Sequence, residues 1–170
     1  KTLEVSIEKM VYGGEGLART PEGVLLVPGV LPGERAMVRI EPARRGVRRG
    51  HLVELLDSSP DRIAPECPYF ARCGGCHHQH ISYARQLELK RQILAECFER
   101  IAKVRLEAPI AVIASEPWRY RNRVRLQIEK QPSAFQAGYR ELSSHQLCPV
   151  DCCPISSPAL QAAIKELQSQ

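Results

Sequence analysis

Three cysteines and three histidines lie within fourteen positions, in the stretch CPYFARCGGCHHQH at residues 67–80. Cys67, Cys73 and Cys76 have the spacing C-x5-C-x2-C, and two glycines inside the CxxC let thiolates converge while backbone amides approach the sulfurs. A tetrahedral zinc site would take its fourth ligand from one of the histidines. A [4Fe–4S] cluster generally takes a fourth cysteine, and three more stand at positions 148, 152 and 153. The sequence therefore predicts a metal centre of one of these two kinds.

The cysteine count also bears on the compartment. The total of seven is odd, and three surround a CxxC, which favours thiolate metal ligands in a reducing compartment over a disulfide framework. The chain has no run of about eighteen apolar residues and no charged-then-apolar leader, so we expect a cytoplasmic protein without a membrane span.

Basic residues are concentrated in one short part of the chain. Residues 118–140 carry six Lys or Arg against one acidic residue, whereas the first sixty residues carry nine against eight. Such an excess is typical of a surface that binds a polyanion. Its candidate phosphate contacts are Arg119, Arg121, Arg123 and Arg125, beside Trp118 and Tyr120, which can stack on bases or belong to the core. A second group of arginines surrounds one expected turn and offers further phosphate contacts; the alternative is a solvated loop that binds no RNA. These residues are Arg44, Arg45, Arg48 and Arg49.

Two kinds of structure must position these residues. In the first sixty residues, short alternating or apolar runs are separated by turns rich in glycine and proline, a pattern typical of a small β-barrel or sandwich. Residues 58–66 are expected to be a linker. Residues 121–129 alternate between arginines and apolar residues and predict a strand. Ser157 and Pro158 predict the start of a last helix.

An amphipathic helix is predicted at residues 82–102, with Ser82 as its N-cap. Its expected apolar stripe consists of Leu87, Leu94, Cys97, Phe98 and Ile101. Cys97 is therefore expected to act as a small hydrophobic residue and not as a ligand.

Taken together, these motifs resemble a known family. The cysteine motif, followed by a tyrosine and a helix rich in Gln and Lys, is similar to the iron–sulfur motif of the RNA uracil-C5 methyltransferases, especially the 23S rRNA type with an N-terminal TRAM domain. GGEGLART, GVLLVPGVLPGERAMVRI and the Ser-Pro-x-Arg element of residues 59–62 resemble the TRAM barrel and its exit. PWRYRNRVRL, AGYR and CPISSPAL resemble the central domain. Almost all 170 residues are covered.

The resemblance implies a mixed fold in three parts. Residues 1–60 would form the TRAM domain, an OB-like β-barrel; residues 61–102 the iron–sulfur segment with its helix; and residues 103–170 an incomplete α+β central domain. It also implies a [4Fe–4S] cluster whose fourth cysteine precedes Pro-Ile, so the ligands are expected to be Cys67, Cys73, Cys76 and Cys153. Cys148, in a Cys-Pro of its own, and Cys152 depart from the family pattern.

Members of this family transfer a methyl group from S-adenosylmethionine to C5 of a uridine in a Rossmann-like catalytic domain. No strand, Gly-rich loop and helix unit follows residue 140. The resemblance therefore implies that this chain alone binds structured RNA, expected to be 23S rRNA, as a monomer, and that methylation and S-adenosylmethionine binding need the missing domain. The alternatives are a tRNA-type methyltransferase, a zinc- or iron–sulfur-containing RNA-binding module without catalysis, and an electron carrier, which has little use for a basic barrel.

Overall fold

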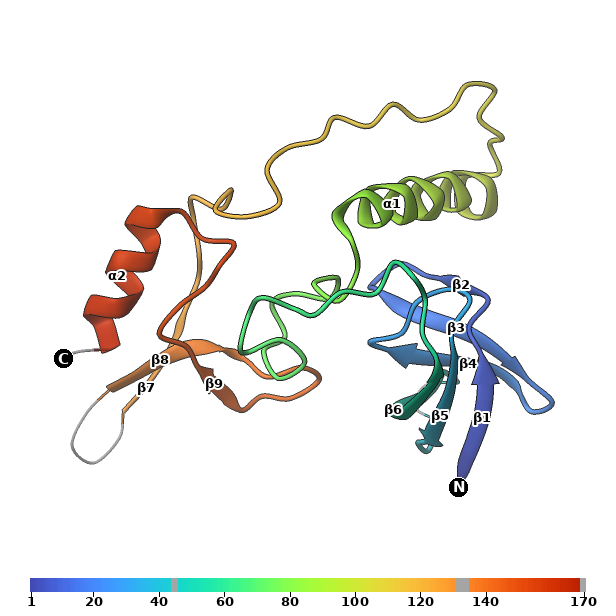
Figure 1. Ribbon diagram of the computed structural model, residues 1–170, viewed down its shortest axis with the longest axis horizontal. Coiled ribbons are helices and arrows are strands. Elements are labelled where there is room, and N and C mark those ends of the chain that lie inside the picture. Colours follow the sequence, from blue (N-terminus) through green and yellow to red (C-terminus); the bar gives the residue numbers. More distant parts are fainter. Residues whose placement is uncertain (44–45, 131–134, 169–170) are drawn as a thin grey trace. The chain divides into compact units, whose positions relative to one another are not determined.

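The computed structural model describes residues 1–43, 46–130 and 135–168. Within them the chain forms two compact units, each built from two separate stretches of sequence (Figure 1). Unit 1 contains Lys1–Ile63 and His80–Ile113, and unit 2 contains Ala64–Gln79 and Ala114–Gln170. The cysteine motif and the helix that follows it thus lie in different units, although the sequence groups them in one segment. Among the described residues, no helix is long and apolar enough to cross a membrane.

Unit 1 contains a curled six-stranded sheet. Its strands are β1 (Thr2–Ser6), β2 (Lys9–Met10), β3 (Glu15–Thr20), β4 (Gly23–Pro28), β5 (Arg35–Ile40) and β6 (Arg48–Asp57). Their order is β1-β5-β6-β4-β3-β2, with β4 and β6 parallel and the other pairs antiparallel. The two strands at the ends of this order, β1 and β2, follow one another in the first ten residues. The sheet therefore curls around its core, and the predicted N-terminal β unit of a mixed fold is confirmed.

Alternation along the strands explains which side chains fill this core. In β5, Ala36 and Val38 are buried, and in β4, Leu25 and Val27 are buried, while the residues between them are more exposed. Successive side chains of a strand point to opposite faces, so an apolar residue at every second position is enough to build one buried face.

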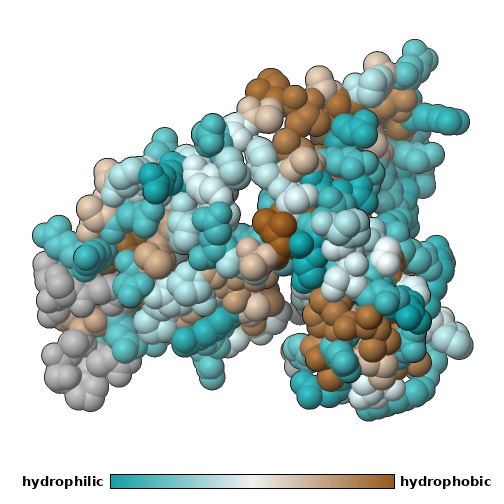
Figure 2. All heavy atoms as spheres, in the orientation of Figure 1, coloured by the Kyte–Doolittle hydropathy of each residue, from teal (hydrophilic) through white to brown (hydrophobic). Residues whose placement is uncertain are grey.

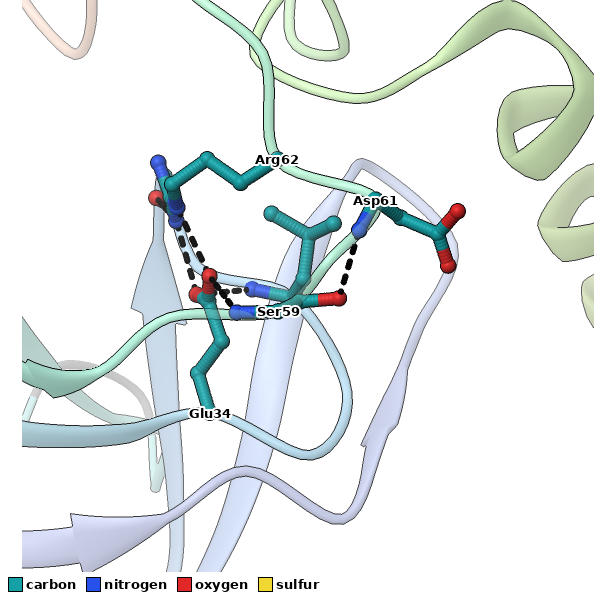
Figure 3. A network of polar contacts seen from close by, with 6 residues as sticks. Glu34, Ser59, Asp61 and Arg62 are labelled. Atoms are coloured by element: carbon teal, nitrogen blue, oxygen red, sulfur yellow. Dashed lines mark hydrogen bonds and ion pairs between the residues drawn. The ribbon is translucent and has the colours of Figure 1, made fainter.

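A buried ion pair fixes the segment that leaves the sheet (Figure 3). The fully buried carboxylate of Glu34 accepts hydrogen bonds from the Arg62 guanidinium at 2.7 Å, from the Leu31 N–H at 2.7 Å and from the Ser59 N–H at 3.1 Å. Burial alone would raise the pKa of Glu34, but these donors outweigh it, so the pKa lies below its ordinary value. The expected linker at residues 58–66 is therefore tied to the sheet through Ser59 and Arg62.

We expect Glu34→Gln to lower the free energy of unfolding of unit 1 by about 2 kcal/mol, since the amide loses charge-assisted hydrogen bonds. Because the folded-state pKa lies below the ordinary value of 4.5, the stabilisation is fully present above pH 4.5 and is lost as the pH falls further. Urea unfolding followed by circular dichroism at about pH 7 and about pH 3 measures this. The difference in unfolding free energy between wild type and variant should be smaller at about pH 3 than at about pH 7. A difference of the same size at both pH values would contradict the expectation.

Helix α1 (Tyr83–Cys97) continues as the π-helical turn η1 (Phe98–Ala102). Ser82 is its N-cap residue, as predicted, but its side chain makes no capping hydrogen bond. Its hydroxyl donates instead to the Asp61 carboxylate at 3.3 Å. The position of the helix start was therefore predictable, and the use of the hydroxyl was not.

The predicted apolar stripe of this helix is wrong. Leu94 is 45% exposed, Phe98 39% and Ile101 79%. Leu89 is buried instead, in a cluster with Met10, Leu31 and Ile81, and Ile93 packs against that cluster. The periodic pattern offers more than one apolar face, and contacts with residues distant in the sequence select the buried one.

The predicted strand at residues 121–129 is also wrong over most of its length. Strand β7 covers only Gln127–Lys130. Before it, Arg121 pairs with the loop that precedes the last helix: its N–H donates to the Ile155 carbonyl at 2.9 Å, and its carbonyl accepts from the Ser157 N–H at 2.8 Å. An alternating pattern predicts a strand only where a partner strand is available.

Figure 2 shows hydrophobic residues along the extended segment after α1, at the top of the view. In this segment, Ile113 is 97% exposed.

Unit 2 contains a three-stranded antiparallel sheet, β7-β8-β9, and a helix. Beyond β7, its elements are β8 (Phe135–Arg140), β9 (Leu147–Pro149) and α2 (Pro158–Gln168). The Leu160 N–H lies 3.5 Å from the Ser157 hydroxyl, which confirms Ser157 as the N-cap of the last helix. The core of the unit consists of Cys148, Val150, Cys153, Ile155 and Ile164.

Candidate metal centre and arginine surface

The loop that carries the first three cysteines is folded by tight turns. The Phe70 N–H donates to the Cys67 carbonyl at 3.1 Å, and the Cys73 N–H donates to the Tyr69 carbonyl at 2.7 Å. Ala71, between them, has a positive φ of 71°. These turns bend the chain back on itself, so that cysteines six residues apart can face the same space.

The same loop is joined to the β8–β9 hairpin. The Gly74 N–H donates to the Arg140 carbonyl at 2.9 Å, and the Leu142 N–H donates to the Arg72 carbonyl at 2.8 Å. A Cβ at Gly74 would lie 3.1 Å from the Arg140 oxygen, closer than most side chains allow. One glycine of the CGGC sequence is therefore needed for close packing of the loop against the hairpin.

The cysteines after β9 are held by contacts at each side. The Val150 N–H donates to the Ala137 carbonyl at 3.2 Å, and the Ser156 N–H donates to the Cys153 carbonyl at 2.8 Å. The Tyr69 hydroxyl donates to the Asp151 carboxylate and accepts from the Asp151 N–H. Tyr69 thus connects the loop of the first three cysteines to the segment that carries the last two.

All four cysteines expected as ligands line one cavity of unit 2. Its lining includes Cys67, Cys73, Cys76 and Cys153, together with Cys152, Arg121, Tyr139 and Gln79. The Gly75 N–H donates to the Cys73 sulfur at 3.4 Å, and the Tyr139 hydroxyl lies 3.8 Å from the Cys153 sulfur. Hydrogen bonds of this kind stabilise thiolates that bind a metal.

Burial shifts the pKa values of the thiols that line the cavity. Burial raises the pKa of Cys67 and raises that of Cys73 to about 11. Burial also raises the pKa of Cys76, although the hydrogen bond with Gln79 and the charge of Arg121 act in the opposite direction. Thiols in such surroundings become thiolates at neutral pH when a metal cation compensates their charge. The donor set therefore fits an iron–sulfur cluster.

The described cysteines and histidines do not form a single-ion site. No group of three or more His, Cys, Asp or Glu side chains in the described part of the chain could hold one metal ion. The three histidines considered for zinc, His77, His78 and His80, do not line the cavity of the cysteines.

The remaining cysteines differ in their relation to the cavity. Cys148 is fully buried in the core of unit 2 but does not line the cavity. Cys152 does line it and is half-buried. Cys97 is half-buried on α1 in unit 1, so its expected place in a buried stripe is wrong, because that stripe is not the buried one.

The two groups of arginines have different surroundings. In the described part of the chain, no ion pair involves Arg119, Arg121, Arg123 or Arg125, and all of these except the half-buried Arg121 are exposed. By contrast, Arg48 pairs with Glu22 at 2.8 Å, and Arg49 pairs with Glu15 at 2.7 Å. Arg44 and Arg45 lie outside the described residues.

The two aromatic residues beside this basic segment also differ. Trp118 packs against the core cluster of unit 2, whereas Tyr120 is 55% exposed. Only Tyr120 is therefore available to stack on a base.

Several residues of the cavity were not anticipated from the sequence. Tyr69 and Asp151 form the hydrogen-bonded connection, and Tyr139 and Arg121 border the thiols. The only local signal was the position of Tyr69 inside the cysteine motif. Tyr139 reaches the cavity from β8, and Asp151 meets Tyr69 from the segment after β9, which no local pattern reveals.

Comparisons with known proteins identify similar sequences and a similar domain. A family model described as the TRAM domain matches residues 1–53. The chain is 37% identical to the 23S rRNA (uracil(1939)-C(5))-methyltransferase RlmD of Alkalilimnicola ehrlichii, over 97% of this chain and 38% of that protein. It is 32% identical to an uncharacterised RNA methyltransferase of Halalkalibacterium halodurans, over 98% of this chain and 36% of that protein.

A solved structure is also similar. The crystal structure of Pyrococcus abyssi tRNA (uracil-54, C5)-methyltransferase in complex with S-adenosyl-L-homocysteine matches with a TM-score of 0.63 and 26% identity. The match covers 97% of this chain and 36% of that one. The chain thus spans somewhat more than a third of the length of these relatives.

Proposed function

Because this chain belongs to the TRAM-domain RNA uracil-C5 methyltransferases, as the counterpart of their N-terminal portion, we propose that it is the RNA-binding part of such an enzyme and carries a structural [4Fe–4S] cluster. The curled sheet of unit 1 would be the OB-like barrel of the TRAM domain. The cluster would be held in unit 2 by Cys67, Cys73, Cys76 and Cys153.

One observation carries this proposal. Three cysteines of one loop and a fourth more than seventy residues later line a single cavity, and an arginine of the basic segment lines it too. Four thiols that share one cavity match the ligand set of a cubane. This arginine, Arg121, belongs both to the cavity and to the basic segment, which supports a link between the metal centre and the RNA-binding surface.

When bound, the cluster would supply iron–thiolate bonds that join the cysteine loop to the segment before α2. The chain itself contributes the donors around the sulfurs: the Gly75 N–H at Cys73 and the Tyr139 hydroxyl at Cys153. Such hydrogen bonds stabilise the thiolate form and fix the orientation of each ligand. The role of the metal centre would be to hold the basic segment in place.

RNA contacts would come mainly from the basic segment of unit 2. Arg119, Arg121, Arg123 and Arg125 have no acidic partners among the described residues, so phosphates could pair with them without breaking an ion pair. Before Arg48 and Arg49 of the barrel could bind phosphate, their ion pairs with Glu22 and Glu15 would have to break. Arg44 and Arg45 remain proposed contacts at the same barrel turn. We therefore assign the larger share of binding to Arg119, Arg121, Arg123 and Arg125, with Tyr120 as a stacking partner.

The proposed substrate of the whole enzyme is 23S rRNA, because the names of several similar proteins specify it. Transfer of a methyl group from S-adenosylmethionine to C5 of a uridine would take place in a part of the enzyme with no counterpart in this chain. The chain alone would therefore bind RNA as a monomer in the cytoplasm without methylating it.

Iron and sulfide analysis of protein purified without oxygen tests the proposal. We expect about four iron atoms and about four sulfides per chain, with the broad visible absorbance of a cubane. The Cys67→Ser/Cys73→Ser double variant should contain no cluster. One zinc ion per chain in place of iron would overturn the proposal and favour a zinc-containing RNA-binding module.

A further inference from the structure

The cavity of unit 2 is lined by five thiols, although a cubane uses four. The fifth belongs to Cys152, the neighbour of Cys153. Adjacent side chains of an extended segment point to opposite sides, yet both of these cysteines border the same space. The family pattern accounts for Cys153 but not for Cys152.

Contacts on both sides keep this pair at the cavity. Tyr69 fixes Asp151 through two hydrogen bonds, and the Cys153 carbonyl accepts the Ser156 N–H. Between these two points the chain consists of Cys152 and Cys153, and both side chains border the cavity.

From this geometry we propose that Cys152 is a reserve ligand, which takes the place of Cys153 on the same iron atom when the Cys153 sulfur is lost or blocked. The inference rests on the proposed cluster. When the Cys153 sulfur is lost or blocked, one iron atom would lack its thiolate ligand, and Cys152 would fill that position. The Cys152 thiol would lose its proton to solvent on binding, and no iron atom would change oxidation state.

Cys148 provides a matched control within the same unit. It is also a thiol close to the cysteines of the site, and it is fully buried in the same core, but it does not line the cavity. A general effect of nearby thiols would include Cys148, whereas a reserve ligand must border the cavity.

The test compares iron content after anaerobic reconstitution of wild type, Cys152→Ser, Cys153→Ser, Cys152→Ser/Cys153→Ser and Cys148→Ser/Cys153→Ser. Alkylation with iodoacetamide and mass spectrometry then identifies the cysteines that the cluster protects. We expect Cys152 to be alkylated in the wild type and protected in Cys153→Ser, which should keep most of its iron. The Cys152→Ser/Cys153→Ser variant should lose its iron, and the Cys148→Ser/Cys153→Ser variant should resemble Cys153→Ser.

The results separate this inference from the proposed function. If the wild type binds iron and Cys153→Ser loses as much of it as the Cys152→Ser/Cys153→Ser variant, the reserve role is wrong and the cluster proposal stands. Loss of iron in Cys148→Ser/Cys153→Ser but not in Cys152→Ser/Cys153→Ser would assign the reserve role to Cys148 and overturn the inference. If the wild type binds no iron, the cluster proposal itself fails.

Discussion

Replacing Cys76 with serine is expected to abolish iron binding and to destabilise unit 2. A cluster that joins Cys76 to Cys153 closes a loop of more than seventy residues. In the chain-entropy model of disulfides, a cross-link over a loop of this size stabilises the folded state by about 4 kcal/mol. Small domains have total stabilities of roughly 5–15 kcal/mol, so unit 2 should lose a large part of its free energy of unfolding.

The single tryptophan of the chain makes this measurable. Trp118 packs against the core cluster that contains Cys153, so its fluorescence reports the unfolding of unit 2. Thermal unfolding of anaerobic wild type and Cys76→Ser should differ clearly in midpoint. Cys97→Ser makes the same chemical change on α1 of unit 1 and should leave both iron content and this transition unchanged. Iron loss without any change in the fluorescence transition would show that the cluster does not stabilise the fold.

Removing two arginines of the basic segment is expected to weaken RNA binding by about tenfold or more at low salt. Arg123 and Arg125 are exposed, have no ion pair with the described residues and do not line the cysteine cavity. The double variant Arg123→Ala/Arg125→Ala therefore changes the proposed phosphate contacts without touching the metal centre. Loss of two phosphate contacts should reduce the slope of log K against log salt by about 1.4 if they lie on the loop of a stem-loop RNA and by about 1.8 if they lie on its stem.

A variant with the same change in charge is the control. Arg48→Ala/Arg49→Ala removes two arginines that already pair with Glu22 and Glu15, so we expect RNA affinity to fall by less than about threefold. Fluorescence anisotropy with a labelled stem-loop RNA, at several salt concentrations, measures both effects. Equal losses in the two variants would indicate that net charge, and not the basic segment, determines binding.

The cysteine loop and the strands of the sheet could be predicted from the sequence because their signals are local. Cys67, Cys73 and Cys76 lie close together in the chain, and glycines between them permit tight turns. Strands such as β4 and β5 alternate buried and exposed residues, which is a property of a single strand. The start of α2 at Ser157 and Pro158 is likewise determined by adjacent residues.

The tertiary structure decided what depends on distant partners. The apolar pattern of α1 did not reveal that Leu89 would be the buried residue, since Met10 and Leu31 come from the other stretch of unit 1. The alternation of residues 121–129 predicted a strand, but β7 covers only Gln127–Lys130, and Arg121 pairs with the loop around Ile155. A side chain's environment is determined by contacts across the fold, and the charge or polarity of one residue does not specify its partner.

The same distinction applies to the candidate sites. By itself the sequence determined which residues can bind iron or phosphate, because thiol and guanidinium chemistry belongs to the side chain. Only the fold decided that Arg49 pairs with Glu15 while Arg123 lacks an acidic partner among the described residues. Only the fold, too, brought a fifth thiol to the cavity of unit 2, because the walls of a cavity come from segments that are far apart in the chain.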